Sequence, residues 1–406
     1  MKFKDYQIST KLKQELDRLA LVKPTDIQFK SIRHILEGED VFAVAYTGTG
    51  KTAAFVIPIL ELIQRRGKKE KGVQAIVLVP TRELALQISG VFDEIGRGLW
   101  VRTVCIHGGV DQEGQKELLD QGAQVVVTTP GRMFDLVAQG TLSLKQVKHL
   151  VLDEADLMLD MGFRKDVEDL VKKLPARRQN LFFSATINKK IKSFAYQIVR
   201  DAIRIQLSPK NPVAKTIDHA VAFIEMDDKR FFLENILKEY EESRFLVFVR
   251  TKVRAERVVK AMERVHVETR FLHGGLDQKE RLEILDAFRE NRIRVLITTD
   301  VAARGIDIPN VEYVINYDLP EYPENYVHRV GRTGRGKQRG QALSFCAESE
   351  LELLEEIEDY TGEEIVRYEL DKQSYREILF DSEEDGDDWQ KLLRDANKED
   401  GTEENW

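Results

Sequence analysis

The stretch Ala45-Tyr46-Thr47-Gly48-Thr49-Gly50-Lys51-Thr52 decides the fold of the first half of this chain. An apolar run before it predicts a buried strand, and the apolar run Ala53–Ile57 after it predicts a packed helix. Glycines at such a junction let main-chain N–H groups turn towards an anion, and the helix presents its positive end. Lys51 can then reach terminal phosphates, and the Thr52 hydroxyl can ligate Mg²⁺. The pattern predicts a phosphate cradle, although its first position is Ala instead of the usual Gly; a Gly-rich turn is the alternative.

Length and composition are those of a multidomain protein without a membrane span. The chain has 406 residues, of which 42% are hydrophobic and 33% are charged, so we expect two or three domains. Its first residues lack the apolar core of a signal peptide, and no apolar run is long enough to span a bilayer. Cys105 and Cys346 each lie in an apolar run and are expected to be reduced core residues. These features predict a cytoplasmic protein.

The negative charge of the chain is concentrated near its end. Residues 371–406 carry 13 Asp or Glu and 5 Lys or Arg, a net charge of -8, which equals the net charge of the whole chain. The remaining residues are therefore neutral as a set, which permits a local basic groove for a polyanion. We expect 371–406 to be a disordered acidic tail, with protein partners as a possible role.

Apolar runs with strand character alternate with helical patterns through most of the chain. Continuous Val, Ile, Leu and Phe runs are typical of parallel strands covered on both faces, so the expected fold class is α/β with two tandem parallel sheets. Ligands of such sheets bind at the carboxyl ends of the strands. The predicted strands are Val41–Ala45, Ala75–Val79, Val101–Ile106, Val125–Thr128, His149–Leu152, Asn180–Phe183, Ile203–Leu207, His219–Ile224, Arg244–Val249, Glu268–Leu272, Ile293–Ile297, Tyr313–Asn316 and Ala342–Phe345.

The two halves repeat one another in order. His107-Gly108-Gly109 recurs as His273-Gly274-Gly275, and Thr128-Thr129 recurs as Thr298-Thr299. These offsets of 166 and 170 residues predict duplicated domains of one fold, the second without a cradle. A proline-containing stretch separates them. The expected limits are an N-terminal region at 1–29, a first domain at 30–207, a linker at 208–215, a second domain at 216–370 and the tail at 371–406.

Acidic residues follow one of the predicted strands. Asp153-Glu154-Ala155-Asp156 comes directly after His149–Leu152. A carboxylate at the mouth of a buried strand is costly without a cation or a donor. Beside a phosphate cradle, Asp153 is the expected Mg²⁺ holder, and Glu154 can orient or deprotonate an attacking water. A helix N-cap with acids in its first turn is the alternative.

With these residues the chain resembles the DEAD-box RNA helicases of superfamily 2, from about Phe3 to Tyr368. The resemblance implies two RecA-like domains, ATP and Mg²⁺ as cofactors, and RNA as the partner of a monomer. Its motifs follow one another in family order: Pro24–Gln28 (the Q motif), Ala45–Thr52 (motif I, where the family also begins with Ala), Pro80–Ala85, Gly108-Gly109, Thr129–Arg132, Asp153–Asp156, Ser184–Thr186 (motif III), Thr298–Asp307 (motif V) and His328–Arg335 (motif VI).

The resemblance assigns the nucleotide contacts. The amide of Gln28 can pair with both the N6 amine and N7 of adenine, which would select ATP. Phe3 would stack on the base, while Ala20-Leu21 stand where the family commonly has Gly and an aromatic residue. The full set implied to bind ATP is Phe3, Gln28, Thr47, Gly48, Thr49, Gly50, Lys51, Thr52 and Asp307, with Mg²⁺ held through Thr52 and Asp153.

Motif VI is dense in guanidinium groups, which suit phosphate. A solvated basic loop is the alternative. The resemblance implies that Arg332 and Arg335 act on the γ-phosphate, so the implied catalytic set is Lys51, Asp153, Glu154, Arg332 and Arg335. The residues implied to couple the two domains are Asp156, Ser184, Thr186, His328 and Arg329, with the hydroxyls of Ser184 and Thr186 expected to bond Asp156 and His328.

The RNA surface is implied by the resemblance in the same way. Hydroxyls, glycine N–H groups and arginines suit phosphate and sugar, so little sequence specificity is expected, and contacts to the 2′-OH would favour RNA. Turn capping is the alternative for each threonine taken alone. The implied RNA-binding residues are Thr81, Arg82, Gly109, Thr129, Arg132, Gly275, Gln278, Arg281 and Thr298.

The sequence therefore predicts an ATP-dependent RNA helicase, an RNA-stimulated ATPase that binds RNA across a two-domain cleft, separates short duplexes and hydrolyses ATP to release product. One alternative uses the same residues, an ATP-gated RNA clamp or assembly scaffold with little net unwinding. A DNA translocase is a further alternative, although the Q motif and the Asp153–Asp156 set resemble those of RNA enzymes. Strand release from a short duplex, and competition between RNA and DNA for ATPase stimulation, separate these readings.

Overall fold

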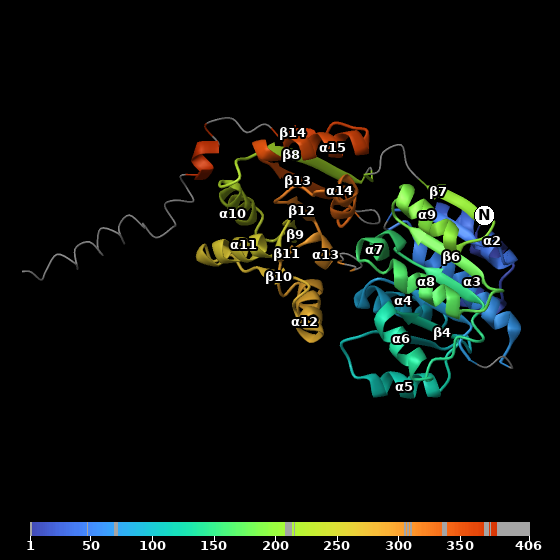
Figure 1. Ribbon diagram of the computed structural model, residues 1–406. Coiled ribbons are helices and arrows are strands. Elements are labelled where there is room, and N and C mark those ends of the chain that lie inside the picture. Colours follow the sequence, from blue (N-terminus) through green and yellow to red (C-terminus); the bar gives the residue numbers. More distant parts are fainter. Residues whose placement is uncertain are drawn as a thin grey trace, which may run out of the picture. The chain divides into compact units, whose positions relative to one another are not determined.

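A computed structural model describes most of the chain, namely residues 2–46, 48–68, 72–207, 213–214, 216–303, 306, 308, 311–334, 339–368, 373 and 375–379, with the side chain of Gln278 excepted. The contacts divide these residues into two compact units, the first reaching to Leu207 and the second beginning at Val213. Each unit is a parallel sheet covered by helices (Figure 1). The predicted class, two tandem parallel α/β folds, is confirmed.

The first unit is built on a sheet of seven strands among the described residues. All their pairings are parallel, in the order β3-β4-β2-β5-β6-β1-β7. The strands are β1 (Val41–Ala45), β2 (Ala75–Leu78), β3 (Thr103–Ile106), β4 (Val125–Thr128), β5 (His149–Leu152), β6 (Gln179–Ser184) and β7 (Ile203–Leu207).

The helices of this unit cover both faces of the sheet. They are η1 (Phe3–Asp5), α1 (Thr10–Arg18), α2 (Asp26–Glu37), α3 (Lys51–Arg66), α4 (Arg82–Ile95), α5 (Gln112–Asp120), α6 (Pro130–Ala138), α7 (Ala155–Asp160), α8 (Arg164–Lys173) and α9 (Lys189–Ile198). Strand β1 shows why the strands are continuously apolar: Ala43 packs in the core with α1 to α4, whereas its neighbour Phe42 packs on the other face with α6 to α9.

The second unit repeats this architecture. Its seven described strands are all parallel, in the order β10-β11-β9-β12-β13-β8-β14, which is the order of the first sheet with each number raised by seven. The predicted duplication of one fold is thus confirmed. The strands are β8 (Ile217–Phe223), β9 (Phe245–Phe248), β10 (Arg270–Leu272), β11 (Val295–Thr298), β12 (Tyr313–Asn316), β13 (Gly340–Cys346) and β14 (Val366–Tyr368).

Helices also cover the sheet of the second unit (Figure 1). They are α10 (Lys229–Glu239), α11 (Lys252–Arg264), α12 (Gln278–Arg289), α13 (Asp300–Ala303), α14 (Pro323–Val330), η2 (Glu348–Glu350) and α15 (Leu351–Thr361). Apolar residues of α10 and α11, such as Leu233 and Val258, form one core with Val247 of β9 and Phe345 of β13.

The strand predictions hold to within two residues at each end, and one strand was missed. Strand β14 is exposed at all three positions, so it carries no apolar run that a sequence pattern would detect. Residues 375–379, which were assigned to the tail, are helical, and Tyr375 packs on Phe232 with 4.8 Å between ring centroids. That part of the predicted tail belongs to the folded unit, because apolar side chains within it join the core.

Three further expectations concern the linker and the tail, membrane spans and the cysteines. Of the predicted linker 208–215 the structure describes residues 213 and 214, and residues 380–406 of the predicted tail lie outside the described part. Within the described residues, no helix combines the length and the apolar character that crossing a membrane requires. Both cysteines are free thiols, Cys346 buried and Cys105 partly buried.

Candidate functional site

The predicted cradle lies between β1 and α3. Gly48 and Gly50 adopt φ values of 79° and 91°, the left-handed region that glycine enters without strain, and α3 begins at the next residue, Lys51. Thr49 closes the loop, because its hydroxyl donates to the carbonyl oxygen of Tyr46 at 2.7 Å. The loop therefore directs the N-terminus of a sixteen-residue helix at the space in front of it.

Lys51 has the position that an anion site requires. Its side chain is buried, and its Nζ atom has no hydrogen-bond partner among the described residues. An ammonium group that is buried without a partner is costly, so the site favours an anion beside it. Thr52 is the second residue of the same helix and is half-buried.

Asp153 lies on the same edge of the sheet as the cradle. It follows β5, and only β6 separates β5 from β1 in the strand order. Burial raises the pKa of the Asp153 carboxyl to about 7, and the charge of Lys51 opposes that rise. One oxygen accepts from the N–H of Glu154 at 3.0 Å. The buried carboxylate of Asp153 and the ammonium group of Lys51, which has no hydrogen-bond partner among the described residues, lie on one edge and together fit a nucleoside triphosphate with its Mg²⁺.

Glu154 holds an unusual main-chain conformation. Its φ of 49° and ψ of 51° lie in the left-handed region, which a non-glycine residue adopts at a cost. Such strain gathers at functional sites, and here it falls on the residue predicted to orient the attacking water. The alternative, a helix N-cap with acids in its first turn, is present in part. Glu154 stands at the N-cap position of α7 and Asp156 lies in the first turn, but the side chain of Glu154 makes no capping hydrogen bond.

Asp156 connects the end of β5 to the end of β6. Its Oδ2 atom accepts from the N–H of Ala185 at 3.0 Å, from the N–H of Thr186 at 2.9 Å and from the hydroxyl of Thr186 at 3.1 Å. The expected Thr186–Asp156 bond is present. Ser184 differs from expectation, because its hydroxyl donates to the carbonyl oxygen of Thr186 at 2.9 Å instead of to Asp156. Ser184 therefore stiffens the turn that carries Thr186.

Gln28 makes contacts that the sequence argument did not foresee. Its Oε1 atom accepts from the N–H of Thr25 at 3.0 Å, and its Nε2 atom donates to the carbonyl oxygen of Gly50 at 3.1 Å. The first contact is half of a capping box at the start of α2, and the Thr-x-x-Gln spacing was a signal for it. The second contact ties α2 to the cradle. Pairing of this amide with adenine stays a prediction.

Phe3 is buried rather than presented on a surface. Its side chain is 3% exposed and packs in the first core, with its ring centroid 6.0 Å from that of Tyr6. Stacking of Phe3 on a nucleotide base stays a prediction as well. Ala20 stands where the family commonly has glycine. Its φ of 55° lies in the left-handed region, which explains why glycine suits this position.

The residues predicted to bind RNA in the first unit lie at the carboxyl ends of β2, β3 and β4. These three strands are neighbours at one side of the sheet, and β2 adjoins β5, which leads to the Asp153 side. Thr81 caps α4 by accepting from the N–H of Leu84 at 3.3 Å, and Thr129 stands at the N-cap position of α6. The predicted RNA residues and the cradle therefore occupy adjoining halves of one sheet edge.

Arg82 and Gly109 are in direct contact, although 27 residues separate them. Gly109 has φ +81°, the left-handed region that favours glycine, and a Cβ atom there would lie 2.0 Å from a guanidinium nitrogen of Arg82, so that side chain would have to shift. Arg132 approaches the same loop, because its Nη2 atom donates to the carbonyl oxygen of Val110 at 3.0 Å. The structure thus brings together three of the predicted residues into one basic surface with exposed main chain.

The corresponding residues of the second unit follow β10 and β11, which are again neighbours. Gly275 is exposed, and its N–H donates to Nδ1 of His273 at 3.1 Å. Arg281 extends from α12 and donates to the carbonyl oxygen of Ala302 at 2.7 Å. Thr298 is fully buried, with its hydroxyl bonded to the carbonyl of Leu272 at 3.3 Å, so its side chain supports the loop rather than forming its surface. Gln278 begins α12.

Arg329 of α14 is a buried arginine with several hydrogen-bond partners in the second unit. Its guanidinium group is paired in two-pronged fashion with Asp300, at 2.6 Å from Nε and 2.8 Å from Nη2. Its Nη1 atom donates to Asn316 at 3.3 Å and to the carbonyl oxygen of Asp318 at 2.6 Å. The side chain is 1% exposed, so Arg329 joins α14 to the residues that follow β11 and β12. No local pattern in the sequence marks Asp300 as the partner of Arg329, although Asp300 lies within motif V.

The structure describes some of the remaining residues of motifs V and VI and not others. His328 is half-buried and Arg332 is buried, both within the second unit. Three of the residues predicted to contact ATP or to act on it, Thr47, Asp307 and Arg335, lie outside the described residues. Their roles, and any coupling through His328 or Arg329, stay predictions.

Comparisons with known proteins show which sequences and structures this chain resembles. Two family models match the chain, DEAD/DEAH box helicase over residues 25–194 and Helicase conserved C-terminal domain over residues 228–337. The ATP-dependent RNA helicase DbpA of Bacillus subtilis is 38% identical over 371 residues, which are 91% of this chain and 77% of that protein. The DEAD-box ATP-dependent RNA helicase CshA of Geobacillus kaustophilus is 39% identical over 367 residues, 90% of this chain and 78% of that protein. Among solved structures, S. cerevisiae Dbp5 bound to RNA and ADP BeF3 gives a TM-score of 0.83 at 32% identity, covering 93% of this chain and 99% of that chain.

Proposed function

The chain belongs to the DEAD/DEAH box helicase family, and from this premise we propose how its two RecA-like units use ATP and RNA. Members of this family are ATP-dependent RNA helicases, which hydrolyse ATP in response to RNA, and this chain is one of them. The proposal concerns the finer steps: ATP and RNA bind across a cleft between the units, a short duplex is separated locally, and hydrolysis releases the product.

One observation carries the proposal most directly. The buried, orphaned Lys51 and the buried Asp153 lie on the same sheet edge as the surface formed by Arg82, Gly109 and Arg132. A nucleotide bound at Lys51 and Asp153 and an RNA backbone bound at the surface of Arg82, Gly109 and Arg132 would contact adjoining loops of one sheet. Binding of either ligand can then influence the other through the loops after β2 and β5.

The residues of the first unit have separate roles in this scheme. Lys51 holds the terminal phosphates, and Thr52 with Asp153 would hold Mg²⁺, which when bound neutralises charge on those phosphates. Glu154 orients the attacking water and accepts its proton. Asp156 and Thr186 transmit a shift of the β5 loop to the β6 loop, because one carboxylate oxygen receives three hydrogen bonds from the latter.

The second unit supplies the remaining charge. Arg332 and Arg335 act on the γ-phosphate when the units close, and Arg329 keeps motif VI in place through Asp300. Gly275, Gln278 and Arg281 extend the RNA surface, and the buried Thr298 supports the loop behind it. The units extend beyond the predicted limits 30–207 and 216–370, because residues before 30 pack in the first core and residues 375–379 pack in the second. We propose that a monomer acts on RNA with little sequence specificity, since the predicted contacts suit phosphate and sugar.

The test is ATPase activity of the full chain with and without single-stranded RNA. We expect a large stimulation by RNA, and mutual tightening of RNA and a non-hydrolysable ATP analogue, since both ligands favour the closed state. Equal turnover in the presence and absence of RNA would contradict the coupling. Release of one strand from a short duplex distinguishes a helicase from a clamp, which would retain RNA for as long as ATP is bound.

Two variants assign the chemistry to the first unit. Lys51→Ala should lose ATP binding and turnover together, whereas Glu154→Gln should lose turnover and keep ATP binding. Glu168→Gln is the matched control and should retain both, because Glu168 is a half-buried glutamate paired with Arg164 on α8. Undiminished turnover in Glu154→Gln would remove its assigned role.

A further inference from the structure

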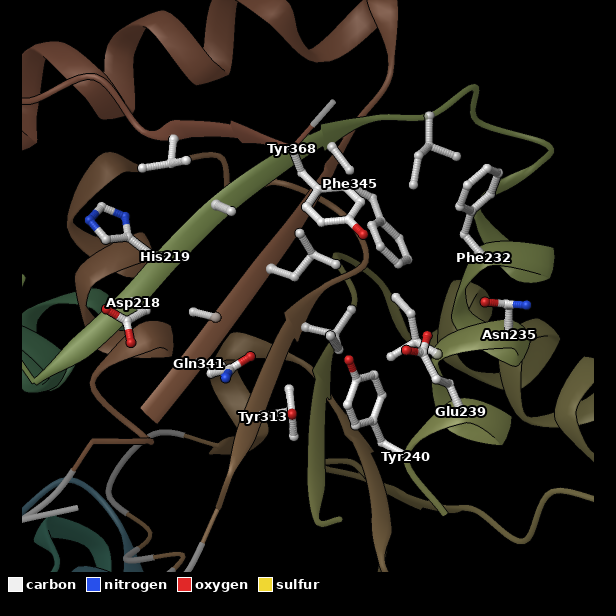
Figure 2. A pocket seen from close by; sticks show the side chains of 18 of the residues that line it. Asp218, His219, Phe232, Asn235, Glu239, Tyr240, Tyr313, Gln341, Phe345 and Tyr368 are labelled. Atoms are coloured by element: carbon white, nitrogen blue, oxygen red, sulfur yellow. The ribbon is translucent and has the colours of Figure 1, made fainter. Parts of the chain in front are cut away.

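A cavity on the second unit lies apart from every residue assigned to ATP or RNA. Its volume is about 460 Å³, and it opens beside β8, β12 and β13 at the end of α10 (Figure 2). Its walls include Tyr240, Tyr313 and Tyr368, and we call it the tyrosine pocket. Cavities of this size that combine apolar walls with a few polar groups are typical of specific binding sites.

The pocket has the chemistry of a site for an aromatic side chain. Apolar residues such as Leu343 and Phe345 of β13 line the pocket. Asn235 and Glu239 of α10 and Gln341 of β13 offer oxygen acceptors (Figure 2). Tyr240 and Tyr368 remain 39% and 56% exposed, so the pocket leaves large aromatic surfaces in water. An indole fits this combination, because its ring needs apolar contact and its N–H needs an acceptor.

The chain itself leads into this pocket. Residues 375–379 lie on the same face, where the hydroxyl of Tyr375 donates to Asp228 at 2.8 Å and accepts from the N–H of Glu225 at 3.1 Å. Ile378 lines the pocket. The next 27 residues, 380–406, lie outside the described part, so the part of the chain that follows the pocket wall is long enough to return to it.

One segment of those residues matches the pocket. Trp389, Leu392 and Leu393 have the i, i+3, i+4 spacing that places apolar side chains on one face of a helix. Lys391 and Arg394 accompany them within an otherwise acidic stretch, and the pocket rim carries the exposed carboxylate of Glu239. Trp389 is ten residues beyond Leu379, a distance that an extended chain spans with up to roughly 33 Å of reach.

We propose that the tyrosine pocket holds Trp389 of the same chain, with Leu392 and Leu393 packed at its mouth. The segment 389–394 then folds back on the second unit, and the acidic stretches on either side of it are held near that face. The docking site is the face of the sheet beside α10, so the loops that carry the RNA-binding and ATP-binding residues stay accessible.

Tryptophan fluorescence of the full chain tests the docking, because the chain has three tryptophans, Trp100, Trp389 and Trp406. Two variants leave one tail tryptophan each: Trp100→Phe/Trp406→Phe keeps Trp389, and Trp100→Phe/Trp389→Phe keeps Trp406 as the matched control. We expect Trp389 to emit at shorter wavelength and to be quenched by acrylamide with a constant severalfold smaller than that of Trp406. Equal quenching of the two would overturn the proposal.

A pocket variant and a dilution series identify the binding surface. Tyr240→Ala/Tyr368→Ala removes two exposed walls and should raise the quenching of Trp389 to that of Trp406, whereas Tyr196→Ala, an equally exposed tyrosine of the first unit, should not. Protection that survives the double substitution would place Trp389 elsewhere. Protection that disappears on dilution would mean that a second copy supplies the segment, and this would also reject docking within one chain.

Discussion

The side-chain amide nitrogen of Gln28, in α2, donates to the carbonyl oxygen of Gly50, the residue directly before α3, at 3.1 Å. A residue predicted to recognise a base therefore also holds the loop predicted to bind phosphate. The base and the phosphates of a bound nucleotide would therefore contact α2 and the loop before α3, which are joined by this hydrogen bond. Disturbing the contact from the glycine side should affect nucleotide binding without touching any side chain of the cradle.

Gly50→Ala is the corresponding variant. A Cβ atom at Gly50 would lie 2.5 Å from Nε2 of Gln28, and the φ of +91° disfavours alanine. We expect the ATP dissociation constant to rise at least about tenfold, which corresponds to about 1.4 kcal/mol of lost binding free energy. Gly38→Ala is the control, since its φ of +88° is the same but no atom lies within 4 Å. If both variants bind ATP equally well, the contact has no role in the cradle.

Asp300→Asn should destabilise the second unit. The substitution leaves the guanidinium group of Arg329, which is 1% exposed, without its ionic partner, and breaking a buried pair costs roughly 3 kcal/mol. The exposed pair of Asp218 and Arg339 provides the control, because Asp218→Asn should cost less than about 1 kcal/mol. Urea unfolding followed by circular dichroism measures both. Similar losses in the two variants would mean that burial of Arg329 is not what makes Asp300 important.

His149 should make the stability of the first unit depend on pH. Burial, together with the charge of Arg66, lowers the pKa of His149 from 6.5 to about 4 in the folded chain. Its Nδ1 atom lies 2.8 Å from Oε1 of Gln179, whose amide nitrogen donates elsewhere, so Nδ1 carries the proton of a neutral ring. Because the unfolded state binds the extra proton more readily, stability is retained above pH 6.5 and is lost as pH falls towards 4.

The matching measurement compares the native residue with His149→Gln. Between about pH 7.5 and pH 5, the free energy of unfolding should fall by about 2 kcal/mol more in the native chain than in the variant. Trp100, which packs against the core of the first unit, reports the transition when Trp389 and Trp406 are replaced by Phe. If the free energy of unfolding depends on pH in the same way in both chains, the pKa of His149 is the same in the folded and unfolded states.

Ala20→Gly should stabilise the first unit. Ala20 follows the end of α1 with φ 55°, its N–H bonds to Asp17 and the N–H of Leu21 bonds to Leu16, which together form a Schellman motif. Glycine removes the strain of the left-handed conformation, for a gain of about 0.5–1 kcal/mol after the entropy of the unfolded chain is counted. Thermal unfolding monitored through Trp100 measures the gain. A loss of stability would mean that the methyl group of Ala20 contributes more packing than it costs in strain.

Most strands were predictable because their burial is continuous. Val125–Thr128 is buried at every position, and a run of this kind is recognisable without any knowledge of its neighbours. Strand β14 was missed for the opposite reason, since Val366, Arg367 and Tyr368 are all exposed and pair only with β8 at the edge of the sheet. Its formation depends on an existing sheet, and this information is not local.

The site divides in the same way. Residues whose predicted roles rest on a local pattern lie where that pattern predicts: Lys51 begins the helix after its glycines, and Asp153 directly follows its strand. The role of Asp300 depends on a partner 29 residues away on another element, and the second bond of Gln28 depends on a loop 22 residues away. Spacing within one helix or strand cannot reveal such pairs, because they are set by how the strands are ordered.

The shared strand order has a consequence for how the protein is made. In each sheet the strand that begins the unit, β1 or β8, lies between two strands that come last along the chain of that unit. Neither sheet can therefore be completed until its final strand has been synthesised, at Leu207 in the first unit and at Tyr368 in the second. A growing chain can close its first sheet while the second is still being translated, so folding can proceed one unit at a time from the N-terminus.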